Sequence, residues 1–226
     1  MFSKILTSAL FAGFATGILV SVLQFMFVQP VLLHAELYEG GTLQHFGAVA
    51  VSSDQDLGGF DLTRDGLSIL FTVLIYTGYA LILAGAMAMA TDRGIAVTPR
   101  SGLIWGIAGF IAVHFAPAFG QPPEVPGVAA ADVLPRQIWW FLTVIATACA
   151  LALIAFGNGW AMWGAAIVLL AAPHVIGAPE PDSFSGPVPP ELAALFASRA
   201  LGVGLAAWVM LGGLCAYFWR QELEET

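Results

Sequence analysis

Three histidines are the residues of this sequence best suited to chemistry, because each ends a hydrophobic run and is followed by glutamate in the same predicted loop. Two of these loops, "HFAPAFGQPPEVPG" and "PHVIGAPEP", are rich in proline. Each proline fixes φ and removes a backbone donor, so the loops suit ligands that are held in a fixed frame. Imidazole and carboxylate bind divalent first-row metal ions. The candidate metal ligands are His34, Glu36, Glu39, His114, Glu124, His174 and Glu180.

The histidines also allow a simpler interpretation, in which each lies at the membrane surface and hydrogen-bonds a loop carbonyl. A histidine with a downstream acid recurs at three places, so the metal interpretation carries the same weight as this simpler one. The residue types do not name the metal, because imidazole suits several ions. His45 has no counterpart in the other loops and is interpreted as a surface residue.

The composition predicts that these residues sit in a membrane protein. Of 226 residues, 59% are hydrophobic and 10% are charged, whereas soluble domains carry about 25% charged residues. The net charge is −8 and no basic stripe exists, which excludes a nucleic-acid-binding protein. Cys149 and Cys215 both lie inside apolar runs and are interpreted as small core residues.

Six apolar segments are each long enough to cross a bilayer, whose hydrocarbon core of about 30 Å takes about 20 helical residues. Backbone groups must be paired within hydrocarbon, so we predict helices. The fold class is therefore an all-α integral membrane protein, with one transmembrane domain over 1–226 and a long outer loop over 30–65. The six predicted spans are 4–28, 67–90, 101–117, 137–156, 160–176 and 194–219.

Loop charges predict the orientation of these spans. One side carries four of the seven basic residues, Lys4, Arg93, Arg100 and Arg220, together with both termini. The opposite side carries 11 of the 15 acidic residues. Because basic loops stay inside, both termini are expected in the cytoplasm and the histidine loops outside.

The three histidine loops also suggest an internal repeat. Each loop ends in an arginine at the start of the next span, and the gaps from histidine to arginine are 30, 22 and 25 residues. We therefore predict three parallel two-helix hairpins around an axis along the bilayer normal, which would bring the histidines to one depth. The arginines are interpreted as structural clamps paired with glutamates, although snorkelling to headgroups would also explain them. They are Arg64, Arg136 and Arg199.

Two further patterns concern packing and catalysis. Gly13 with Gly17, and Gly102 with Gly106, have the small-xxx-small spacing that lets membrane helices approach closely. No nucleotide-binding P-loop, G-x-S-x-G or H-E-x-x-H motif is present, and no charged residue lies in the middle of a predicted span. The sequence therefore predicts no enzyme and no resident cofactor.

Five stretches together resemble the CbtA family of predicted cobalt transporter subunits: "LFAGFATGILVSVLQ", "VQPVLLHAELYE", "HFAPAFGQPPEVPG", "RQIWW" and "PHVIGAPEP". The resemblance covers nearly the whole chain and is weakest in the loop 40–63. It implies a bacterial inner-membrane protein for cobalt uptake linked to cobalamin synthesis. It also implies a partner of the CbtB type, a small single-helix protein with a histidine-rich end.

The leading hypothesis is a transporter subunit that takes up a divalent metal ion, cobalt by the resemblance, and captures it on the periplasmic face. The ion is then the transported substrate, membrane lipid surrounds the chain, and a homo-oligomer stays open. Two alternatives remain: a membrane-embedded enzyme with a metal at its outer face, for which Glu124 or Glu180 could be the general base, and a scaffold subunit without metal.

Overall fold

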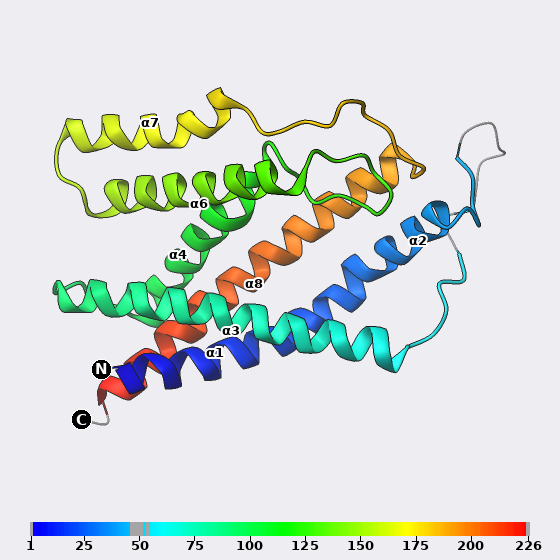
Figure 1. Ribbon diagram of the computed structural model, residues 1–226. Helices are drawn as coiled ribbons and strands as arrows, with labels where there is room; N and C mark the ends of the chain where they lie inside the picture. Colours follow the sequence, from blue (N-terminus) through cyan, green and yellow to red (C-terminus); the bar gives the residue numbers. More distant parts are fainter. Residues whose placement is uncertain (1, 46–51, 53–54, 225–226) are drawn as a thin grey trace. The chain divides into compact units, whose positions relative to one another are not determined.

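The computed structural model describes residues 2–45, 52 and 55–224, and all regular structure in these residues is helical (Figure 1). Two π-helices, Gln24–Val28 and Ile111–Phe115, join α1 to α2 and α4 to α5. The prediction of an all-helical chain is thereby confirmed. The α-helices are α1 (Phe2–Leu23), α2 (Gln29–Glu39), α3 (Leu62–Asp92), α4 (Pro99–Phe110), α5 (Ala116–Ala118), α6 (Val133–Phe156), α7 (Trp160–Ile176) and α8 (Pro190–Glu224).

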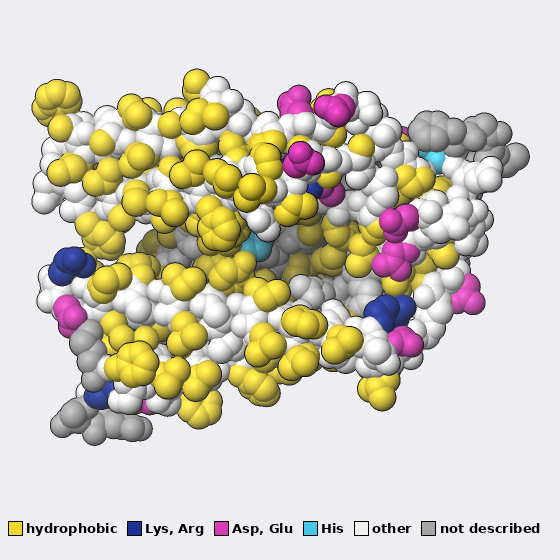
Figure 2. Space-filling view, in the orientation of Figure 1, with side chains coloured by type: hydrophobic (Ala, Val, Ile, Leu, Met, Phe, Trp, Pro, Cys, Tyr) yellow, Lys and Arg dark blue, Asp and Glu magenta, His cyan; other side chains and the backbone are white. Residues whose placement is uncertain are grey.

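The helices are long and apolar enough to make a multi-pass membrane protein. Among the described residues, five continuous helical stretches meet the length and hydropathy of a span, while α7 is apolar but has only 17 residues, about 26 Å of helix. All six predicted spans fall inside helices. Hydrophobic side chains cover much of the helix surfaces (Figure 2), as expected for helices that face lipid.

The first helix continues beyond its predicted end. Helix α2 occupies the beginning of the segment that we expected to be a loop over 30–65, so the connection to α3 starts only after Glu39. Pro30 and Pro117 each lie two residues beyond the end of a π-helix. A proline in a continuing helix clashes with the carbonyl four residues earlier and removes a hydrogen bond. The widened π-turn offers room for that carbonyl, which explains why the helix continues past the proline rather than ending there.

The chain divides into two compact units, each built from separate stretches of sequence. The first unit comprises 1–28, 58–110 and 202–226, and the second comprises 29–57 and 111–201. The single transmembrane domain over 1–226 stays a prediction.

In the first unit, glycines bring α1 against α3. A Cβ atom on Gly13 would lie 2.4 Å from Cα of Thr77, and one on Gly17 would lie 2.5 Å from Cα of Val73. The backbones of the two helices are therefore in contact, and the helices lie side by side in Figure 1. A side-chain hydrogen bond adds to this contact, in which Thr72 Oγ1 of α3 donates to Oε1 of Gln24, the residue after the end of α1, at 3.1 Å.

Within the first unit, α4 and the part of α8 after residue 201 approach through glycine as well. A Cβ atom on Gly102 would lie 2.4 Å from the carbonyl oxygen of Gly212, and one on Gly106 would lie 2.1 Å from that of Trp208. The prediction that Gly13, Gly17, Gly102 and Gly106 face other helices is confirmed.

In the second unit, α6 packs along α7, and the adjoining loops close over the end of α2 (Figure 1). The indole of Trp139 on α6 donates to the carbonyl of Pro173 on α7 at 3.1 Å. A small hydrophobic cluster holds α2 to the loops, and the amide of Ala129 donates to the carbonyl of Ser185 at 2.8 Å. The cluster consists of Ala35, Tyr38, Val125 and Val188.

The threefold hairpin repeat is not confirmed. Each π-helix is followed by a proline, Pro30 or Pro117. When the two segments are aligned at these prolines, the residue that corresponds to His114 is Phe27. His34 comes seven residues after Phe27, about 10 Å further along a helix. His34 and His114 are therefore not equivalent in the local structure that surrounds them, although their residue type recurs.

Candidate functional site

All three candidate histidines belong to the second unit. His34 lies in α2, His114 in the π-helix Ile111–Phe115, and His174 in the last turn of α7. Each side chain is partly buried. Nε2 of His34 and Nδ1 of His174 are buried with no hydrogen-bond partner among the described residues, whereas His114 makes contacts. Two imidazole nitrogens are thus available to a ligand.

His174 lies among aromatic rings. Its ring meets that of Phe119 edge to face at a centroid distance of 5.1 Å, and that of Trp139 at 6.2 Å. Trp139 is held in place by its hydrogen bond to Pro173, the residue before His174. Apolar rings limit the access of water to the imidazole and so favour any ligand that replaces water there.

His34 has a different surrounding on α2. Its ring stacks on that of Tyr38, one helical turn later, at a centroid distance of 5.7 Å and an angle of 28°. Tyr38 and Ala35 belong to the hydrophobic cluster described above, which anchors this turn of the helix. The histidine is therefore positioned by a packed segment.

The candidate carboxylates all lie on the surface. Glu124 pairs with Arg136, with Oε2 and Nη2 2.8 Å apart, and the stem of Glu39 lies over Gly127 of the same loop. The structure brings no three His, Cys, Asp or Glu side chains of the described residues close enough to hold one ion. The four exposed carboxylates are Glu36, Glu39, Glu124 and Glu180.

The three arginines differ in what they contact. Arg136 ties the loop that carries Glu124 to the first turns of α6. Arg64 instead pairs with its neighbour Asp65 at 2.8 Å, which is a local contact at the start of α3. Arg199 lies in α8 and has contacts of its own. Their role as clamps between repeats stays a prediction.

Sequence reasoning missed the role of Asp65, a carboxylate with 2% exposure. It accepts a hydrogen bond from the amide of Asp61 at 2.8 Å, while Asp61 accepts one from the amide of Arg64 at 2.7 Å. This reciprocal capping fixes the beginning of α3. The signal was the run "DLTRD", with acids placed four residues apart just before an apolar run.

The family described as "Probable cobalt transporter subunit (CbtA)" matches residues 2–220 of the chain. The chain belongs to the CbtA family. The resemblance drawn from the sequence is thereby confirmed over nearly the whole length. Comparison with curated proteins and with solved structures finds no match.

CbtA membership suggests cobalt transport and implies that other subunits complete the transporter. A transporter subunit is a non-enzyme class, and a metal ion is then the cargo. The long apolar helices agree with this class, because they suggest a multi-pass membrane protein.

Proposed function

We propose that the chain is the membrane-embedded subunit of a cobalt uptake transporter in a bacterial inner membrane, and that it serves cobalamin synthesis. His34, His114 and His174 capture the ion from the periplasm. The observation that carries the proposal is that Nε2 of His34 and Nδ1 of His174 are buried without a hydrogen-bond partner in the described residues. Negative charge in the same unit comes from the exposed Glu36, Glu39, Glu124 and Glu180.

A buried nitrogen without a partner is costly, since the lost hydration amounts to about 1–3 kcal/mol. A cobalt ion accepts the lone pair of neutral imidazole and removes this cost. The rings of Phe119 and Trp139 beside His174 keep competing water away.

Among the residues that the structure describes, the donor set is incomplete for a metal ion. Tetrahedral sites take four ligands, and no group of three potential ligand side chains occurs in the described part of the chain. The family description names a subunit, so we propose that a small histidine-rich subunit of the CbtB type supplies the missing ligands.

Cobalt binding by the purified protein, alone and co-purified with the partner, tests this proposal. We expect the complex to bind Co²⁺ at least about tenfold more tightly than the isolated chain, because added ligands complete the shell. His174→Ala should weaken binding by the complex, whereas His45→Ala, which changes an exposed histidine, should not. Equal affinity of the two preparations, or of the His174→Ala complex and the original complex, would contradict the proposal.

The orientation is a separate prediction, with both termini in the cytoplasm. Ser183 and Ala96 are exposed and lie in loops that we place outside and inside, respectively. In a background without Cys149 and Cys215, Ser183→Cys should react with a membrane-impermeant maleimide in intact cells. Ala96→Cys should react only after the membrane is permeabilised. The reverse pattern would contradict the orientation.

A further inference from the structure

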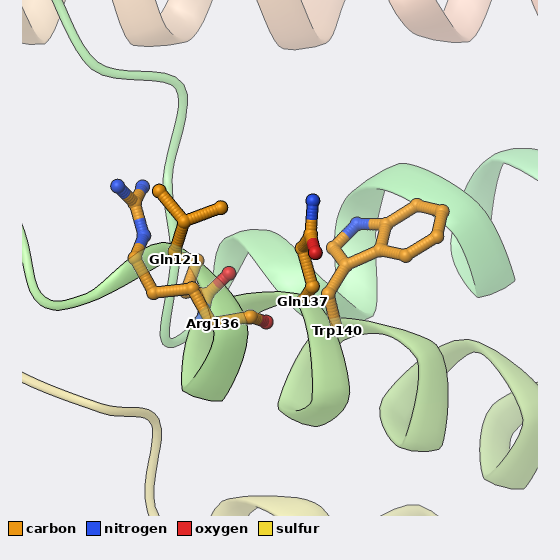
Figure 3. A pocket seen from close by; sticks show the side chains of 5 residues that line it. Gln121, Arg136, Gln137 and Trp140 are labelled. Atoms are coloured by element: carbon orange, nitrogen blue, oxygen red, sulfur yellow. The ribbon is translucent and has the colours of Figure 1, made fainter.

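A pocket at the beginning of α6 carries hydrogen-bond donors that the transport proposal does not use. Its volume is about 230 Å³, and it is lined by Gln121, Val133, Arg136, Gln137 and Trp140, all within the second unit. Figure 3 shows the side chains of Arg136, Gln137 and Trp140 leaving α6 toward the same side. The pocket therefore combines the N–H groups of Arg136, Gln137 and Trp140 with the apolar surfaces of Val133 and the indole ring.

These donors have unused capacity. Nη2 of Arg136 donates a hydrogen bond to Oε2 of Glu124 at 2.8 Å. A guanidinium carries five N–H groups, so the others remain for a ligand. Within the described residues, the amide of Gln137 and the indole nitrogen of Trp140 have no hydrogen-bond acceptor. The neighbouring Trp139 differs, since its indole is satisfied by Pro173. Gln137 is exposed and Trp140 is half-buried, so an acceptor from outside the chain can reach both donors.

The position of the pocket on the helix defines what kind of molecule brings that acceptor. Helix α6 has 24 residues, about 36 Å, so its first turns lie at the edge of a hydrocarbon core of about 30 Å. One and two turns below Gln137, at i+4 and i+8, come Phe141 and Ile145, which are 58% and 59% exposed. A ligand that fits both parts has a polar head and an apolar tail.

The acceptor must also suit the charges of the pocket. Arg136 is already neutralised in part by Glu124, so a single negative charge spread over several oxygens fits better than a multiply charged anion. Phosphate oxygens accept charge-assisted hydrogen bonds from guanidinium and amide groups, and tryptophan favours this depth of the membrane.

We propose that this pocket binds the phosphodiester of a membrane phospholipid, whose acyl chain lies along Phe141 and Ile145. Gln121 holds the base of the site, because its amide donates to the carbonyl of Arg136 at 3.3 Å. The bound lipid bridges the loop that carries Glu124 and the beginning of α6. This assignment does not depend on metal transport.

Titration of the purified full-length protein with phosphatidylglycerol, and with diacylglycerol of the same acyl chains, followed by native mass spectrometry, tests the proposal. We expect phosphatidylglycerol to bind at least about tenfold more tightly than diacylglycerol. This difference in affinity is what one hydrogen bond to a charged acceptor contributes. The double change Gln137→Leu with Trp140→Phe keeps the Arg136–Glu124 ion pair and removes two donors, so it should reduce the preference for phosphatidylglycerol.

Trp160→Phe is the matched control, because Trp160 is 89% exposed at the start of α7 and outside the pocket. It should leave the preference for phosphatidylglycerol unchanged. Equal affinity of the original protein for both lipids would overturn the proposal, and this comparison needs no variant. An unchanged preference in the double variant would overturn it too. Displacement of the lipid by millimolar inorganic phosphate would assign the pocket to a free anion instead.

Discussion

Cobalt uptake should fall at least about tenfold, to the level of cells without the protein, when His34, His114 and His174 are all changed to alanine. The reason is that these imidazoles are the proposed capture ligands, and loss of metal ligation removes affinity by an order of magnitude or more. Uptake of radioactive cobalt at low external concentration measures the effect. Since two of the imidazoles have no hydrogen bond to lose at one nitrogen, the fold should survive the change.

The controls separate capture from folding. His45→Ala removes an exposed histidine and should leave uptake intact. The amount of triple variant in the membrane and its thermal unfolding should match those of the original protein. Undiminished uptake by a correctly inserted triple variant would rule out capture by these histidines.

The largest effect on stability is expected from Gly106→Ala. Its new methyl group would lie 2.1 Å from the carbonyl oxygen of Trp208 and 2.8 Å from the carbonyl carbon, so α4 and α8 would have to separate. Overpacking against backbone should lower the free energy of unfolding by about 3 kcal/mol, the upper part of the usual range. Thermal unfolding in detergent measures the loss.

Gly78→Ala is the matched control in the same unit, because nothing lies within 4 Å of a Cβ atom placed there. Alanine has a higher helix propensity than glycine by about 1 kcal/mol, so this variant should be unchanged or slightly more stable. If both variants unfold at the temperature of the original protein, the contact between α4 and α8 does not contribute as described.

The helices could be predicted from the sequence, because uninterrupted apolar runs leave a chain in lipid few alternatives. The ends of the helices could not. We predicted that the first span ends at residue 28, whereas the π-helix Gln24–Val28 lets the chain continue through Pro30 into α2. Whether a proline ends or bends a helix depends on tertiary packing that composition does not contain.

The candidate site was predictable in part. The histidine loops were found from residue type, and the structure places all three histidines in one unit. Their mutual geometry could not be predicted from the recurrence, since a side chain's direction depends on helix rotation and on local turns. The seven-residue offset between Phe27 and His34 illustrates this. Gln137 and Trp140 belong to the motif "RQIWW", but nothing in that motif predicted that their N–H groups would line a pocket.

Helix α7 has a consequence for the bilayer around it. As the fifth span of the proposed topology, its 17 residues cover about 26 Å, several ångströms less than the hydrocarbon core. Hydrophobic mismatch of this sign draws the lipid leaflets together. The hydrocarbon core is then thinnest beside α7, between Asn158 just before the helix and His174 in its last turn. A metal ion held at His174 would face a shorter barrier there than beside any longer helix.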